Sequence, residues 1–281
     1  MEAKTTNKLM MALFSLSTLL IIFILFSILA YIFIKGARVI GWEFLTEMPR
    51  KFGEEGGIYP AILGTLYLVA TALVFALPIG VGAAIYFVEF AKESKLTRAI
   101  RITVDTLNGI PSIVLGLFGM AFFVYYLRDF TGGVSILSGG LTLGVMVLPT
   151  IIRTSEISLS SVPKEYIEAS YALGATKLQT IRKIILPVAL PGIITGAILS
   201  FGRAAGETAP IIFTAAISNA VLPKSPFQPT MALTTHLYFL ASEGRAIDKA
   251  YGTALVLICI VLISNFIARS INWYCSRNLR G

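Results

Sequence analysis

Residues 168–187 read EASYALGATKLQTIRKIILP and lie in a long polar interval between two apolar runs. Gly174 predicts the end of a helix, because glycine adopts left-handed backbone angles at low cost. Thr176 and Gln179 have the spacing of a capping box, which starts a second helix. Pro163 opens the first helix, since proline is tolerated in a first helical turn. The interval 163–187 therefore predicts a helix, a sharp turn and a second helix.

The second predicted helix has an apolar face and a charged face. Leu178, Ile181 and Ile185 recur at helical spacing and form an apolar stripe. Pro187 and Pro191 follow where the segment enters the next apolar run. A capped, amphipathic segment of this kind either docks on a partner protein or packs on its own membrane domain.

The composition places the chain in a membrane. The chain has 281 residues, of which 56% are hydrophobic and 14% charged, and its mean hydropathy is +0.81. A soluble domain of this size cannot bury so much apolar surface, so the bilayer must be its solvent. The formal net charge of +8 is typical of the cytoplasmic loops of membrane proteins, and no pattern predicts binding to nucleic acid.

Six apolar runs are long enough to cross the membrane, since a span needs about 20 mostly apolar residues. Gly192 and Gly196 in the fifth run form a small-xxx-small face, which lets another helix approach closely. The short turn between the third and fourth runs leaves these two the least well defined. The predicted spans are residues 10–34, 61–87, 110–127, 134–152, 189–212 and 252–271.

The distribution of Lys and Arg predicts the orientation, because these residues are enriched in cytoplasmic loops. With the N-terminus inside, 13 of them fall in inner segments and 8 in outer segments. Both termini and the segment 163–187 would then lie in the cytoplasm. The charged interval 89–105 is expected to form an interfacial amphipathic helix or a solvated connector.

Three ionisable residues lie in or at the edge of the predicted spans, where charges are costly and usually functional. Arg203 and Glu207 are four residues apart, so one helix would place them on the same face and allow them to pair. Arginine suits phosphate because its planar fork donates two parallel hydrogen bonds. Two alternatives stay open: the pair could be purely structural, and Arg153 could be a boundary residue that reaches toward the cytoplasm.

The spacing in the polar interval resembles the EAA loop of ABC-importer permeases. Glu168 and Ala169 begin the motif, Gly174 follows, and Leu186-Pro187 closes it; only Ser170 departs from the family pattern. The resemblance implies an all-α membrane protein with six transmembrane helices, the type I ABC importer permease fold, and both termini inside. It also implies that these residues couple the permease to a separate ATPase.

A second resemblance concerns the cargo. LPTIIRTSE, the EAA loop, GRAAGETAPI and the downstream LTTHLYFLASEG resemble the phosphate-import ABC permeases, and more closely the PstA subunits than the PstC subunits. The resemblance covers about residue 58 to the C-terminus. It implies that Arg153, Arg203 and Glu207 line the phosphate pathway.

The sequence thus predicts the permease subunit of an ATP-driven importer of inorganic phosphate, multi-pass in the cytoplasmic (inner) membrane of a prokaryote. Its expected partners are a PstC-like permease, an ATP-binding subunit dimer, an extracytoplasmic phosphate-binding protein and membrane lipid. The chain has no phosphate-binding loop for ATP, so we expect no enzyme activity, catalytic residue, metal or cofactor. The predicted division is an N-terminal span with its outer loop, 1–60, and a permease core, 61–281.

The alternatives are a permease for another oxyanion or a phosphonate, and an ATP-independent channel or membrane sensor. The single histidine, His236, is expected to be a polar residue at the membrane edge.

Overall fold

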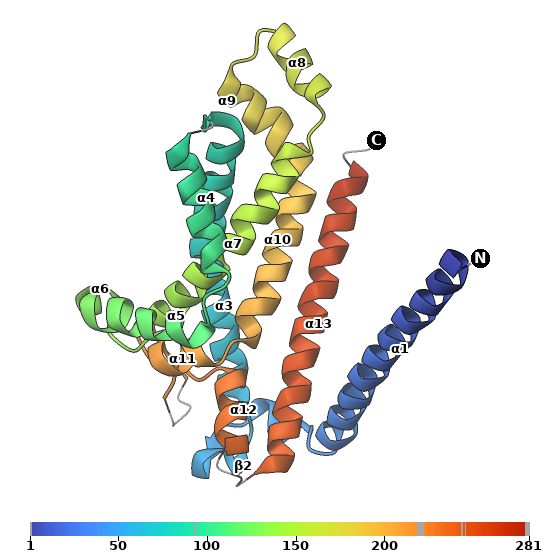
Figure 1. Cartoon of the computed structure of the whole chain (residues 1–281). Helices are drawn as coiled ribbons and strands as arrows, with labels where there is room; N and C mark the ends of the chain where they lie inside the picture. The colour runs from blue at the N-terminus through green and yellow to red at the C-terminus, as the bar shows by residue number, and fades with distance from the viewer. Residues whose placement is uncertain (1, 93, 218–221, 243, 245, 279–281) are drawn as a thin grey trace.

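The computed structural model of this chain describes residues 2–92, 94–217, 222–242, 244 and 246–278 (Figure 1). Helices make up most of its regular structure. In chain order they are α1 (Glu2–Ala37), α2 (Trp42–Thr46), α3 (Tyr59–Ile85), α4 (Lys95–Leu107), α5 (Ser112–Gly119), α6 (Arg128–Thr131), α7 (Ile136–Ser160), α8 (Lys164–Ala172), α9 (Lys177–Thr180), α10 (Leu186–Gly206), α11 (Ala209–Thr214), α12 (Leu233–Ser242) and α13 (Ile247–Asn278).

Several short elements join or extend these helices. The π-helical turns Tyr86–Phe90 and Met120–Tyr126 extend α3 and α5, and a third, Ile181–Ile185, joins α9 to α10. Strands β1 (Pro49–Arg50) and β2 (Glu55–Gly56) form an antiparallel hairpin around the 3-10 turn Lys51–Gly53, with Pro49 opposite Gly56.

The all-α membrane architecture is confirmed. Within the described residues, five helical stretches are long and apolar enough to cross a membrane. They correspond to five of the six predicted spans, and a sixth span results only if a bent pair of helices is counted as one. The five stretches are Thr6–Ala37, Tyr59–Phe90, Ile136–Ser160, Lys177–Gly206 and Ile247–Trp273.

The predicted third span, residues 110–127, is helical over Ser112–Tyr126, but it counts as a candidate span only together with α4. The two helices are bent by 104° across a short break. The break contains Asn108, Gly109 and Pro111, and proline disfavours helical geometry in the residue before it. In Figure 1, α4 runs alongside α7, whereas α5 and α6 project sideways.

The centre of the fold is α7, which packs between α3 and α10 (Figure 1). Small residues bring these helices close together, because a Cβ atom built on Gly196 would lie 2.0 Å from Thr154 Oγ1. A Cβ atom on Gly192 would lie 1.9 Å from Ser158 Oγ, so the predicted small-xxx-small face does form a close helix contact. On the other side of α7, a Cβ atom on Gly140 would lie 2.5 Å from Thr71 Cβ.

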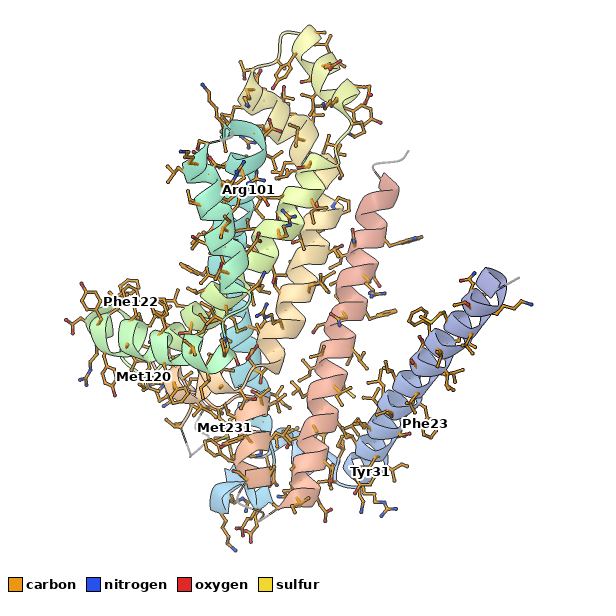
Figure 2. All side chains as sticks on the ribbon, in the orientation of Figure 1. Phe23, Tyr31, Arg101, Met120, Phe122 and Met231 are labelled. Carbon is orange, nitrogen blue, oxygen red and sulfur yellow. The ribbon has the colours of Figure 1, made fainter. Side chains whose placement is uncertain are left out.

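Helix α1 stands apart from this centre. It meets α13 near its own C-terminal end, where the rings of Tyr31 and Tyr251 lie 5.5 Å apart and Gly36 contacts the backbone of Tyr251. Most of its apolar side chains, such as Phe23, point outward, as Figure 2 shows. They are suited to contact lipid or another subunit.

The chain ends are consistent with a shared side. Helices α8 and α9 lie at the upper end of the molecule in Figure 1. The first residues of α1 form the upper end of that helix, and the last residues of α13 form the upper end of α13. Helix α12 and β2 occupy the opposite end. Which end faces the cytoplasm stays a prediction.

Candidate functional site

The segment from α8 to α9 has the predicted helix–turn–helix form. Gly174 adopts a φ of +77°, and its N–H donates to the carbonyl of Tyr171 over 2.9 Å, which closes the end of α8. Thr176 and Gln179 form the predicted capping box, in which the Thr176 N–H donates to Gln179 Oε1 over 2.8 Å. The second helix continues past Pro187, through a π-helical turn, into α10.

Helix α8 projects from the molecule with little support from its own chain (Figure 1). Every residue of α8, including Glu168 and Ala169, is exposed or half-buried. Leu173, beside Gly174, is 89% exposed. Leu186 and Pro187 at the start of α10 are half-buried, and nearby Ile185 is fully buried. The segment is therefore anchored through α10, and α8 contacts the bundle through Ile167 and Ser170 while it exposes most of its other residues. Docking of α8 on a partner stays a prediction.

One further contact of this segment could not be predicted from the sequence. Lys177, the first residue of α9, donates to the backbone carbonyl of Glu89 and lies 3.9 Å from its carboxylate. The Lys177 ammonium also lies 4.6 Å from the centre of the Phe90 ring. These contacts tie the start of α9 to the end of α3.

Glu168 lies on the outward part of α8, so a change of charge there should act on a partner. We expect Glu168→Lys to weaken co-purification of an ATPase subunit with the membrane subunits by about 10-fold, as for loss of a charged contact. Glu165→Lys is the matched control, because it makes the same change in the first turn of α8. Equal retention of the ATPase by both variants would contradict docking at Glu168.

The first charged cluster lies toward the α8 end of the helices. Arg153 on α7 and Arg101 on α4 flank Glu156, at nitrogen–oxygen distances of 3.4 and 3.5 Å. The Glu156 side chain is only 9% exposed, whereas both arginines are far more open. Arg101, labelled in Figure 2, also donates to the carbonyl of Phe87 and stacks over its ring. Arg153 thus pairs with a buried carboxylate while its own side chain is 58% exposed, so both interpretations of Arg153 stay predictions.

A cavity of about 390 Å³ opens on this cluster. Its walls come from α7, α4 and the end of α3, so the two guanidinium groups face open space. The lining residues are Val88, Arg101, Arg153, Glu156, Ile157, Ser160 and Ser161.

The second polar site lies where two helices break. Arg203, in the last turn of α10, donates from Nη1 to Oδ1 of Asn108, the residue that caps α4, over 3.1 Å. The neighbouring helices α5 and α11 touch there, since a Cβ atom on Gly116 would lie 2.9 Å from Pro210 Cα. The breaks of α4–α5 and α10–α11 are therefore adjacent.

The predicted pairing of Arg203 with Glu207 is wrong. Helix α10 ends at Gly206, and Glu207 has extended backbone angles, so the two side chains do not share a helix face. Pro210 explains the ending, because its ring nitrogen has no hydrogen for the carbonyl of Gly206. The backbone carbonyl of Glu207 instead accepts a hydrogen bond of 2.7 Å from Thr234 Oγ1 on α12.

Helix α4 connects the two polar sites. Arg101, Asp105 and Asn108 are spaced to lie on one helix face, and every residue of α4 is exposed or half-buried. Arg101 reaches the cluster around Glu156, and Asn108 reaches Arg203. Sequence reasoning missed these two α4 residues and Glu156, although the spacing of Arg153 and Glu156 and the polar stripe on α4 were available signals.

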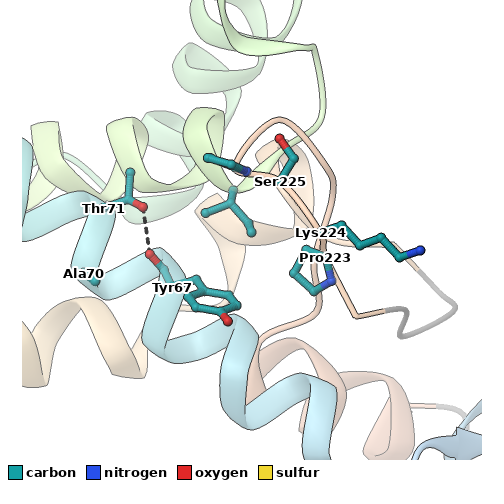
Figure 3. A pocket seen from close by; sticks show the side chains of 8 residues that line it. Tyr67, Ala70, Thr71, Pro223, Lys224 and Ser225 are labelled. Carbon is teal, nitrogen blue, oxygen red and sulfur yellow. Dashed lines mark hydrogen bonds between the residues drawn. The ribbon is translucent and has the colours of Figure 1, made fainter.

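The remaining polar features are separate from these sites. His236 on α12 is 3% exposed rather than at an open edge, and burial lowers its pKa to about 4, so it is neutral at physiological pH. Figure 3 shows a cavity of about 280 Å³ between α3 and the segment 222–228. It is lined mainly by apolar groups, together with Tyr67, Thr71 and Lys224.

The bundle of long apolar helices, with its outward helix–turn–helix segment at α8 and α9, is that of a multi-pass membrane protein. The chain belongs to the family of binding-protein-dependent transport system inner membrane components, whose sequence profile matches residues 76–281. It is therefore a multi-pass inner-membrane permease subunit of an ABC importer from a prokaryote. Membership of this family implies an ATPase partner and a substrate-binding protein.

Several similar proteins are named as PstA permeases, and another carries a general permease name. The chain is 34% identical over 285 residues to the probable ABC transporter permease protein YqgI of Bacillus subtilis, covering 96% of each chain. It is 37% identical over 247 residues to the probable phosphate transport system permease protein PstA of Methanocaldococcus jannaschii, covering 87% of this chain and 86% of the relative. It is 35% identical to PstA 1 of Mycobacterium tuberculosis strain H37Rv, covering 83% and 74%.

Solved structures confirm the fold class. A chain of a bacterial alginate ABC transporter superposes with a TM-score of 0.68 at 18% identity, covering 95% of this chain and 96% of that one. A chain of the inward-facing MetNI methionine ABC transporter gives 0.63 at 23% identity, covering 78% and 97%. The type I importer permease fold is thus shared with these proteins.

Proposed function

We propose that this chain is a permease subunit of an ATP-driven importer of inorganic phosphate. The observation that carries the proposal is the position of Arg203. Its guanidinium lies where the α4–α5 and α10–α11 breaks are adjacent, and the neutral side-chain amide of Asn108 holds it there. A tetrahedral oxyanion matches the fork of donors that such a group presents. Relatives named PstA support phosphate as the oxyanion.

The transported anion would pass Arg203 and then the cluster of Arg153, Arg101 and Glu156. Arg203 and the two arginines of the cluster each favour an anion, while Glu156 compensates part of the positive charge of Arg153 and Arg101. Partial compensation keeps the anion from binding too tightly to leave. Glu207, with its side chain beyond the end of α10, is proposed to line the same pathway.

The chain would work with a PstC-like second permease, an ATP-binding subunit dimer and an extracytoplasmic phosphate-binding protein, in contact with membrane lipid. The dimer would dock on α8 and α9, through Glu168, Ala169 and Gly174, in the cytoplasm. Residues 61–281 would form the working core, and residues 1–60 a peripheral span with its outer loop. Hydrolysis of ATP would take place in the partner, and this subunit would carry no catalytic residue.

The direct test is uptake of radiolabelled phosphate by vesicles that contain the reconstituted complex. We expect uptake to require both ATP and the binding protein, and unlabelled phosphate to compete for it. Competition by sulfate, molybdate or a phosphonate in place of phosphate would instead favour a permease for another oxyanion. This is the second candidate function, because the similar protein YqgI is named only as a permease, without a substrate. Uptake that continues without ATP would favour a channel.

A further inference from the structure

Arg203 differs from the other pathway arginines in what balances its charge. Arg153 and Arg101 both lie beside the buried carboxylate of Glu156. Within the described residues, the hydrogen bond to Asn108 Oδ1 is the only hydrogen bond or ion pair of the Arg203 side chain, so its remaining N–H groups stay available. A charge within a membrane span ordinarily faces an opposite charge, a cavity or a transport pathway.

A neutral partner has a specific consequence. The amide oxygen of Asn108 fixes the position of the guanidinium as a carboxylate would, since both accept a hydrogen bond from it. The amide carries no charge, however, so the full positive charge of Arg203 remains for an anion. A carboxylate at the same position would form an ion pair and compete with the anion.

The location of Asn108 supports this role. It caps α4 at the break before Pro111, and Arg203 lies in the last turn of α10 before the second break. Broken helices in transporters frequently surround the site where the cargo passes. Asn108 is itself exposed in the isolated chain, as a residue beside a pathway must be.

We infer that Asn108 is a positioning residue for the transported anion, which orients Arg203 across the two helix breaks while leaving its charge uncompensated. The inference rests on the proposed function, because it takes the cargo to be an oxyanion. The amide of Asn108 also carries Nδ2, whose two N–H groups are not used in the bond to Arg203. Nδ2 is then an additional neutral donor for the anion.

Two substitutions separate this role from simple helix packing. Asn108→Asp keeps the size and the accepting oxygen but adds a negative charge, and Asn108→Ala removes the contact. If Asn108 holds Arg203 ready for an anion, the aspartate variant should import phosphate about 10-fold or more slowly than the wild type, because an ion pair then competes with the anion. The alanine variant should lose only about 2- to 5-fold, since Arg203 keeps its charge and loses one net hydrogen bond.

The measurement is uptake of radiolabelled phosphate in vesicles containing the complete complex, with ATP hydrolysis recorded alongside. The inference also requires the aspartate variant to assemble and to hydrolyse ATP in response to the binding protein, so that phosphate moved per ATP falls.

The opposite ranking would overturn the inference, because a purely structural contact is preserved or strengthened by aspartate and lost with alanine. Unchanged uptake by both variants would overturn it as well. A wild-type complex that assembles but imports no phosphate would overturn the proposed function itself, which is a separate result from either ranking.

Discussion

Replacing Arg203 with glutamine should abolish phosphate import while leaving the permease able to assemble. Glutamine is uncharged and shorter than arginine, so the hydrogen bond to Asn108, the positive charge and the fork of donors are lost together, whereas the close contacts of α10 with α7 at Gly192 and Gly196 are unchanged. Charge-assisted, bidentate contacts to phosphate are much stronger than neutral ones, so we expect uptake to fall by about 100-fold or more. Uptake of radiolabelled phosphate and co-purification of the subunits measure the two effects separately.

Arg203→Lys should give an intermediate rate, because lysine keeps the charge but lacks the planar fork. Arg128→Gln, on the short and outward α6, makes the same chemical change away from both polar sites and should import phosphate normally. Loss of assembly in Arg203→Gln would indicate a structural role, and normal uptake in that variant would exclude Arg203 from the pathway.

Replacing Gly174 with valine should uncouple the importer. Gly174 adopts a φ of +77°, and a β-branched residue in this conformation is strained by about 1–3 kcal/mol. The turn between α8 and α9 would then open, and α8 would no longer present Glu168 and Ala169 in a fixed position. We expect both phosphate uptake and the stimulation of ATP hydrolysis by the binding protein to be lost together.

The chain offers a matched control for this experiment. A Cβ atom built on Gly174 or on Gly82 meets no atom of the described residues within 4 Å, so neither substitution causes a steric clash there. Gly82 lies within α3 and has ordinary helical geometry, so Gly82→Val should leave coupling intact. Equal loss in both variants would show that added bulk, and not the left-handed turn, is responsible.

Local signals predicted the coupling segment well. Gly174 ends α8 and Thr176 with Gln179 caps α9, because caps depend on residues within one helical turn. The membrane spans were also predictable, since apolar composition over about 20 residues decides them. Most of the fold therefore follows from short stretches of sequence.

The charged contacts were less predictable because they join distant parts of the chain. Asn108 and Arg203 are 95 residues apart, and their contact depends on how α4 and α10 pack. The pairing of Arg203 with Glu207 failed because a continuous helix was assumed across Pro210. The bend before Pro111 was missed for a related reason: composition detects apolar length and not direction.

The close glycine contacts of α7 determine which parts of the importer can move. Side chains of α7 fill the spaces left by Gly192 and Gly196 on α10, and Thr71 of α3 fills the space at Gly140 on α7. These three helices cannot slide past one another without steric overlap at these glycines, so we expect them to move as one unit in any conformational change of the importer.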